Sequence, residues 1–197
     1  MEHNNDITME KMMMTRAARN QYPINGSLEL LPLCNMNCDM CYVRLDHKEV
    51  EKRGGLHSVE EWIDLARQMA DAGVLFLLLT GGEPLLFPGF KKLYLELKKL
   101  GMILTINTNG TLIDEEWADF FAENLPRRIN ITLYGSDDTA YETLCHYPGG
   151  FEKTRKAIRL LRDREIEVKI NGSVTKENWK DVDFIYKIGK ELDAPVH

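Results

Sequence analysis

The strongest constraint on the fold is a repeated alternation between short apolar runs and longer amphipathic stretches. The apolar runs predict strands over residues 28–33, 74–79, 103–107, 129–133 and 168–170. Apolar residues at helical spacing follow each run, and they predict helices from Ser58 onward and over residues 90–100, 114–123, 151–162 and 179–192. Apolar strands separated by amphipathic helices are typical of a parallel sheet that helices cover. The sequence therefore predicts an α/β chain of five β/α units, either an open doubly wound sheet or a barrel, and residues 195–196 are expected to open a sixth strand.

Distinctive polar and small residues follow each predicted strand. In both candidate folds the loops after the strands meet at the carboxyl edge of the sheet, where ligands bind. The residues in question are Cys34, Gly81 to Pro84, Thr108 to Gly110, Tyr134 to Ser136, and Asn171 to Ser173. We therefore expect five loops to converge on one site.

Three of the four cysteines, Cys34, Cys38 and Cys41, lie within eight residues of each other. This distribution indicates metal ligation in a reducing cytosol, not a disulfide framework. Thiolates are the usual ligands of iron-sulfur clusters, and three of them leave one iron of a [4Fe-4S] cluster open for chemistry. Cys145 stands alone, and we interpret it as a small buried hydrophobe. The alternative is that Cys145 is a fourth ligand, which would close the site into a structural zinc or an electron-transfer cluster.

The spacing Cys-x-x-x-Cys-x-x-Cys, followed by Gly-Gly-Glu-Pro and Thr-Asn-Gly after the next two strands, resembles the radical SAM superfamily. Within it, the motifs are most similar to enzymes with a C-terminal SPASM extension, such as anaerobic sulfatase-maturating enzymes and maturases of ribosomally made peptides. The resemblance implies a partial (β/α)6 TIM-like barrel over residues 28–197, preceded by a lead-in segment over residues 1–27. It also implies that the C-terminus is truncated, because SPASM-type enzymes continue into a cysteine-rich extension.

The resemblance implies two cofactors, a [4Fe-4S] cluster on Cys34, Cys38 and Cys41, and S-adenosylmethionine chelated to its open iron. Reductive cleavage of S-adenosylmethionine would give a 5′-deoxyadenosyl radical that abstracts hydrogen from the substrate. The same resemblance assigns contacts with S-adenosylmethionine to Met40, Tyr42, Gly81, Gly82, Glu83, Pro84, Asn109, Thr132 and Asn171. It assigns no further catalytic residue.

The loop after the second strand has a physical reason for its composition. Gly81 and Gly82 carry no Cβ, so their backbone can come close to a ligand. The resemblance implies that this loop binds the methionine amino group, that Glu83 supports it, and that Pro84 starts the next helical segment.

Other assignments depend more on alignment with the family. Met40 stands where an aromatic residue usually packs against adenine, and a thioether can make the same contact. Thr132 aligns with a Ser or Thr that reaches polar groups of the cofactor. Asn109 and Asn171 would contact its ribose or carboxylate, although Asn-Gly also favours tight turns on its own. Tyr134 replaces an Asp of the sulfatase-maturating type, which argues against a sulfatase substrate.

Composition and charge limit the kinds of partner that this chain is expected to bind. The 25 basic and 31 acidic residues give a net charge of −6, which lacks the footprint of a general nucleic-acid binder. The first 22 residues fit neither a signal peptide nor a membrane span, and we interpret them as an amphipathic helix that covers the core. We therefore expect a cytoplasmic enzyme that acts on a peptide or protein, or second on a small metabolite, with flavodoxin or ferredoxin as reductant.

Overall fold

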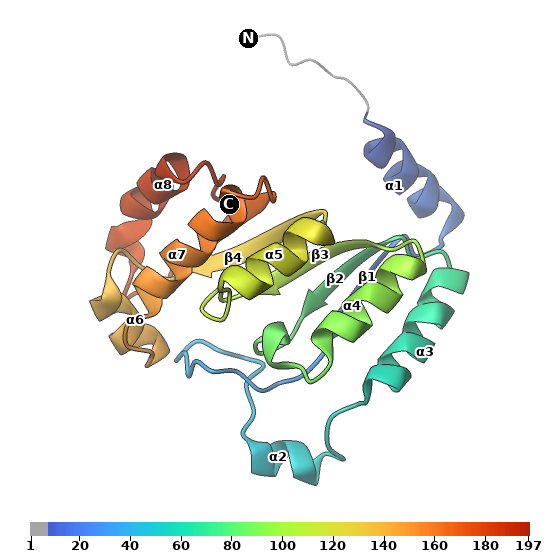
Figure 1. Ribbon diagram of the computed structural model, residues 1–197, viewed down its shortest axis with the longest axis horizontal. Helices are drawn as coiled ribbons and strands as arrows, with labels where there is room; N and C mark the ends of the chain where they lie inside the picture. Colours follow the sequence, from blue (N-terminus) through green and yellow to red (C-terminus); the bar gives the residue numbers. More distant parts are fainter. Residues whose placement is uncertain (1–7) are drawn as a thin grey trace.

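A computed structural model describes residues 8–197 and contains one parallel sheet (Figure 1). Its five strands stand in the order β1-β2-β3-β4-β5. They are β1 (Asn25–Glu29), β2 (Phe76–Thr80), β3 (Ile103–Thr108), β4 (Arg128–Leu133) and β5 (Val168–Gly172). A doubly wound sheet reverses its strand order at a switch point, whereas sequential order is that of a barrel. The partial barrel implied by the family resemblance is thus confirmed.

Helices follow the strands and lie along one face of the sheet (Figure 1). The covering helices are α3 (Val59–Asp71), α4 (Phe90–Lys99), α5 (Glu115–Glu123), α7 (Gly150–Arg162) and α8 (Val182–Glu191). Two shorter helices, α2 (His47–Lys52) and α6 (Asp138–Cys145), belong to the connections after β1 and β4. Single 3₁₀ turns, η1 (Pro84–Leu86) and η2 (Trp179–Asp181), complete the connections after β2 and β5. The five predicted β/α units are confirmed.

The strands have two chemically different faces. Leu79, Ile106, Ile129 and Val168 are neighbours in register on successive strands, and none of the four is exposed to solvent. They pack against the helices, and each fully buried aliphatic side chain of this kind stabilises the fold by roughly 1.5–3 kcal/mol. The alternate residues point to the opposite, concave face, which is less buried and mostly polar. The helices therefore cover one face and leave the other for ligands.

Side-chain caps fix where helices begin. The predicted capping box at Ser58 is present, because Glu61 N–H donates to the Ser58 hydroxyl at 3.2 Å and Ser58 N–H donates to the Glu61 carboxylate at 2.7 Å. Asp114 accepts from Trp117 N–H at 3.0 Å in the same way and starts α5. A cap of this kind contributes about 1 kcal/mol.

The first strand differs from the prediction, because β1 covers residues 25–29, not residues 28–33. The apolar run 30–33 is buried or half-buried, and Leu30 N–H still donates to Thr80 C=O at 2.9 Å, but the chain then leaves the ladder and runs beneath the loop after β2. Gly82 N–H donates to Leu31 C=O at 2.7 Å and Glu83 N–H donates to Leu33 C=O at 2.9 Å. The true strand was missed because Asn25, Gly26 and Ser27 favour strands poorly.

The C-terminal region differs in one respect and agrees in another. The helix predicted over 179–192 is interrupted, since residues 179–181 form a 3₁₀ turn and α8 starts at Val182. The expected sixth strand does open, because Ile170 N–H donates to Pro195 C=O at 2.9 Å and His197 N–H donates to Ile170 C=O at 3.0 Å. Val196 thereby forms a parallel bridge with Ile170.

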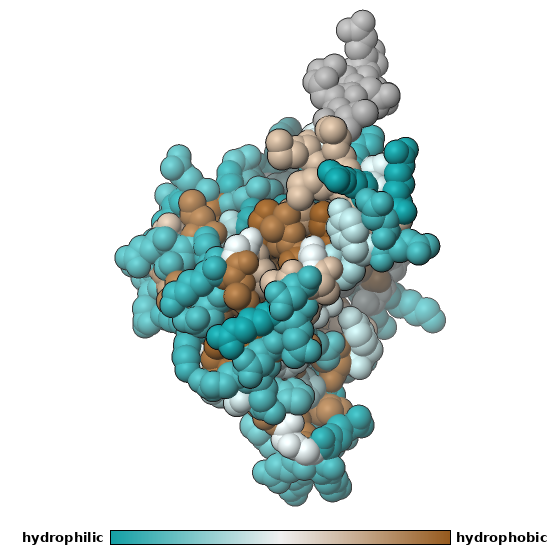
Figure 2. All heavy atoms as spheres, turned by 90° about the vertical axis from the view of Figure 1, so that its right-hand side faces the viewer, coloured by the Kyte–Doolittle hydropathy of each residue, from teal (hydrophilic) through white to brown (hydrophobic). Residues whose placement is uncertain are grey.

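The lead-in helix α1 (Met9–Asn20) forms, but it does not cover the core as predicted. Of its side chains only Ala17 is buried, whereas Met9 and Met12 are 78% and 60% exposed. Figure 2 shows hydrophobic residues gathered beside this helix on an otherwise mostly hydrophilic face. Residues 1–7 of the predicted segment lie outside the described residues. Within residues 8–197, no helix combines the length and apolar character needed to span a membrane.

Candidate active site

A cavity of about 230 Å³ lies at the carboxyl edge of the sheet, and all five strand-end loops line it. The loop after β1 contributes the three clustered cysteines, and the end of β2 contributes Thr80, Gly81 and Gly82. The ends of β3, β4 and β5 contribute Asn107 to Asn109, Thr132, Tyr134 and Ser173. The predicted convergence of the five loops on one site is confirmed.

The cysteine loop is held in place by the end of α6. Asn37 N–H donates to Cys145 C=O and Asp39 N–H donates to Leu144 C=O, both at 3.0 Å. The Asp39 carboxylate also lies 2.7 Å from Nε2 of His146. These contacts leave Cys34 and Cys38 half-buried and Cys41 exposed. A short helix that was not predicted from the sequence thus positions the loop that carries the three clustered cysteines.

The thiols have unequal acidities. Burial raises the pKa of Cys34 to about 11. A hydrogen bond from Cys145 lowers the pKa of Cys38 to about 7, and a second from Tyr134 acts in the same direction. The pKa of Cys145 is raised, first by its hydrogen bond to Cys38 and then by burial. Cys145 is fully buried, as predicted, and it also contacts Cys38, one of the three clustered cysteines.

The three clustered thiols fit an iron-sulfur cluster with an open position. Among residues 8–197, no three His, Cys, Asp or Glu side chains stand close enough together to bind a single metal ion. A cubane takes one thiolate per iron, so its ligands are farther apart than those of a single ion. Cys34, Cys38 and Cys41 line one cavity, and Cys145 is not among its lining residues.

The two glycines after β2 allow backbone to pack on backbone. Gly81 has φ +153, and a Cβ there would lie 2.5 Å from Leu31 O. A Cβ on Gly82 would collide with Leu33 O. Side chains at these positions would therefore push the loop away from the segment that leads into Cys34. Both glycines also line the cavity. Their contact with S-adenosylmethionine stays a prediction.

Glu83 and Pro84 lie beneath the cavity and do not line it. The buried Glu83 carboxylate accepts hydrogen bonds from Thr108 Oγ1 at 2.8 Å, Asn109 N–H at 2.8 Å and Leu85 N–H at 3.0 Å. Burial raises its pKa to about 7. Pro84 is buried and opens η1, as the predicted helical start required. Glu83 thus joins the loop after β2 to the loop after β3.

Asn109 makes the turn contact that the sequence offered as one interpretation, while its contact with the cofactor stays a prediction. Its Oδ1 accepts from Thr111 N–H at 2.9 Å, which is turn chemistry. Its Nδ2 donates to Asn35 Oδ1 at 2.9 Å and approaches Cys34 Sγ at 3.7 Å. It also lines the cavity. Asn109 therefore ties the cysteine loop to the end of β3.

Of the other residues predicted to contact S-adenosylmethionine, three line the cavity and one does not. Thr132 and Met40 line the cavity, and Met40 is 36% exposed. Tyr42 stands at its rim and is 96% exposed. Asn171 is not among the lining residues, and Ser173, two residues further along, takes the place expected for it.

Asn178 is a site residue that sequence reasoning missed. It is buried, and its Nδ2 donates to Tyr134 O at 2.6 Å and to Ser173 O at 2.7 Å. Its Oδ1 accepts from Thr175 N–H at 2.6 Å. Asn178 thus joins the two loops that close the β4–β5 side of the cavity. Its position just before a predicted helix indicates only a helix cap, so the sequence offered no distinguishing signal.

Comparison with known proteins adds the family. Residues 28–188 match the radical SAM superfamily. The chain is 28% identical over 166 residues to the AdoMet-dependent heme synthase of Nitratidesulfovibrio vulgaris, covering 84% of this chain and 44% of that protein. It is 30% identical over 174 residues to a cysteine-type anaerobic sulfatase-maturating enzyme of Clostridium novyi, covering 81% of this chain and 46% of that protein.

Solved structures show the same fold. Streptococcus suis SuiB bound to precursor peptide SuiA superposes with a TM-score of 0.75 at 18% identity, covering 98% of this chain and 45% of that chain. SuiB has also been solved with S-adenosylmethionine. The chain spans less than half the length of each of these relatives. The predicted resemblance to SPASM-type maturases is confirmed, and the chain belongs to the radical SAM superfamily, whose enzymes use a [4Fe-4S] cluster and S-adenosylmethionine.

Proposed function

We propose that this chain is the catalytic core of a radical SAM maturase. Cys34, Cys38 and Cys41 would hold the [4Fe-4S] cluster, and S-adenosylmethionine would occupy the cavity beside them. The observation that carries the proposal is the placement of all three clustered cysteines in one cavity with the glycine loop after β2. Together the two cofactors supply a 5′-deoxyadenosyl radical for hydrogen abstraction from the substrate.

The chain's own residues would hold and shield these cofactors. The backbone of Gly81 and Gly82 would approach the methionine end, because the missing Cβ atoms let this loop pack closely on the Leu31–Leu33 backbone that leads into Cys34. Glu83 fixes that loop from below through Thr108 and Asn109 N–H. Met36, which lines the same cavity and is buried, keeps water from its floor.

We propose a peptide or protein as the substrate. The name of the sulfatase-maturating relative describes an enzyme that acts on a protein, and SuiB has been solved with a bound precursor peptide. Tyr134 lines the cavity where the sulfatase-maturating type has Asp, so a substrate other than a sulfatase is favoured. A small metabolite is the second candidate, because heme synthases are among the relatives. We propose flavodoxin or ferredoxin as reductant, in the cytoplasm.

Anaerobic reconstitution tests the proposed function. The protein should bind about four irons, and adding S-adenosylmethionine should change the spectrum of the reduced cluster. With dithionite it should release deoxyadenosine. Tight zinc without iron, or a cluster that does not respond to S-adenosylmethionine, would instead support the closed four-cysteine site.

A further inference from the structure

A second cavity, of about 460 Å³, lies toward the amino ends of the strands. Arg128 and Asn130 line it, whereas Thr132, two residues further along β4, lines the first cavity. Alternate residues of a strand point to the same side of a sheet, so the two cavities share the concave face. The second cavity therefore lies on the same face as the proposed cofactor site, nearer the amino ends of the strands.

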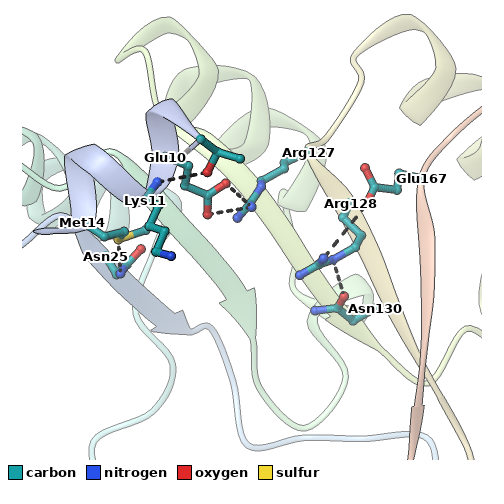
Figure 3. A network of polar contacts seen from close by, with 9 residues as sticks. Glu10, Lys11, Met14, Asn25, Arg127, Arg128, Asn130 and Glu167 are labelled. Atoms are coloured by element: carbon teal, nitrogen blue, oxygen red, sulfur yellow. Dashed lines mark hydrogen bonds and ion pairs between the residues drawn. The ribbon is translucent and has the colours of Figure 1, made fainter. Parts of the chain in front are cut away.

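Hydrogen bonds hold the Arg128 side chain on this face. Its Nε donates to Asn130 Oδ1 at 2.9 Å, and Asn130 Nδ2 donates to Asn107 Oδ1 at 2.7 Å. Asn107 in turn lines the upper cavity. Figure 3 shows Arg128 and Asn130 side by side, with Glu167 beyond the guanidinium. A polar chain thus links the guanidinium to the floor of the cofactor site.

Lys169 adds a second cation beside Arg128. It is paired in register with Asn130, so its side chain lies on the same concave face. Burial lowers the pKa of Lys169, and the charge of Arg128 lowers it further. Arg128 stands two residues before Asn130 on β4, so it is the diagonal neighbour of Lys169 on the same face of the sheet.

Few acids on this face balance the two cations. Arg127 is paired with Glu10 at 2.7 Å, but the nearest carboxylate to Arg128 is the exposed Glu167, at 4.0 Å (Figure 3). Among residues 8–197, no carboxylate lies within ion-pair distance of Lys169. The surplus of positive charge is local, since the whole chain carries −6.

We propose that Arg128 and Lys169 bind a carboxylate of the substrate, supplied by an acidic side chain of the peptide. This inference rests on the proposed function and deepens it. A guanidinium binds a carboxylate through two parallel hydrogen bonds, and a held guanidinium does so at a smaller entropy cost. Arg128 lies four residues before Thr132, about 13 Å along the strand. The acidic side chain would thus anchor the peptide while a residue nearer the cofactor reacts.

The test uses two probe peptides that differ only in charge, Ac-Gly-Glu-Gly-NH2 and Ac-Gly-Gln-Gly-NH2. Each is titrated into the ¹⁵N-labelled chain and followed by amide chemical shifts. The Glu peptide should bind at least tenfold more tightly and shift residues of β4 and β5. Arg128→Gln and Lys169→Gln should each remove this preference, whereas Lys187→Gln on the exposed side of α8 should keep it.

Equal binding of the two peptides to the wild-type chain overturns the proposal, and this comparison decides even where a variant does not fold. Inorganic phosphate serves as a third probe. If phosphate displaces the Glu peptide at equal concentration, the site is a general anion site and the carboxylate assignment is wrong. None of these measurements needs the cluster. Their failure is therefore distinguishable from failure of the proposed function, which iron content and deoxyadenosine release report.

Discussion

The buried carboxylate of Glu83 accepts hydrogen bonds from the hydroxyl of Thr108 at 2.8 and 2.9 Å, which fastens the loop after β2 to the end of β3. A carboxylate without a basic partner in such a place is held by hydrogen bonds alone, and burial disfavours its charged form. This relationship makes the support of the glycine loop sensitive to pH.

The fold should become less stable as pH rises, because Glu83 loses its proton in a buried position. Burial raises its pKa from 4.5 to about 7, so the folded chain holds this proton more tightly than the unfolded chain does. Its contribution to stability is therefore full below pH 4.5 and is lost as pH rises through 7, by roughly 3 kcal/mol. Urea unfolding of wild type and Glu83→Gln at several pH values measures this. Parallel curves for the two proteins would contradict the prediction.

Cys34→Ala, Cys38→Ala and Cys41→Ala should each abolish cluster assembly, because three thiolates would bind three irons of the cubane and each variant leaves one more iron without a protein ligand. Cys145→Ala should keep about four irons per chain, since Cys145 is buried beside Cys38 and outside the cavity lining. Iron content and the spectral response to S-adenosylmethionine measure both. Loss of the cluster in Cys145→Ala alone would point to a closed four-cysteine site.

Gly82→Val should weaken S-adenosylmethionine binding at least tenfold while the cluster still assembles. Its side chain would collide with Leu33 O and displace the loop that lines the cavity. Cofactor titration monitored through the cluster spectrum measures the affinity. Gly101→Ala is the matched control, because Gly101 has φ +79 but open space around it. That variant should lose only about 1 kcal/mol of stability and bind the cofactor normally. If Gly82→Val binds S-adenosylmethionine as tightly as wild type, Gly82 serves only to form the turn.

Sequence alone could predict the parts of the site that depend on short-range spacing. Cys34, Cys38 and Cys41 and the two glycines fall on one loop or one turn, so their spacing already limits their geometry. The β/α alternation predicted a parallel sheet of five units, because most of its strands contain short apolar runs. It left a doubly wound sheet and a barrel open, and only the family resemblance favoured the barrel.

Contacts between distant loops could not be predicted in this way. The helix α6 is short, and its hold on the cysteine loop runs through the backbone carbonyls of Leu144 and Cys145, which no side-chain pattern reveals. Ser173 lines the cavity where Asn171 was expected. Which of the two does so depends on where β5 ends, and strand ends depend on tertiary pairing. The cations of the concave face belong to separate strands and meet only in the sheet.

Asn178→Asp should weaken S-adenosylmethionine binding about tenfold without changing iron content. Aspartate keeps the acceptor for Thr175 N–H but cannot donate to Tyr134 O and Ser173 O, so the two loops lose their link. Each carbonyl left without a partner costs about 1–3 kcal/mol if it stays buried, which favours a displaced loop. Asn124→Asp is the matched control, since it removes a side-chain bond to Phe120 O far from the cavity lining. It should lower the melting temperature without changing cofactor affinity. If both variants lose stability and neither loses affinity, Asn178 supports the fold alone and does not position the cofactor.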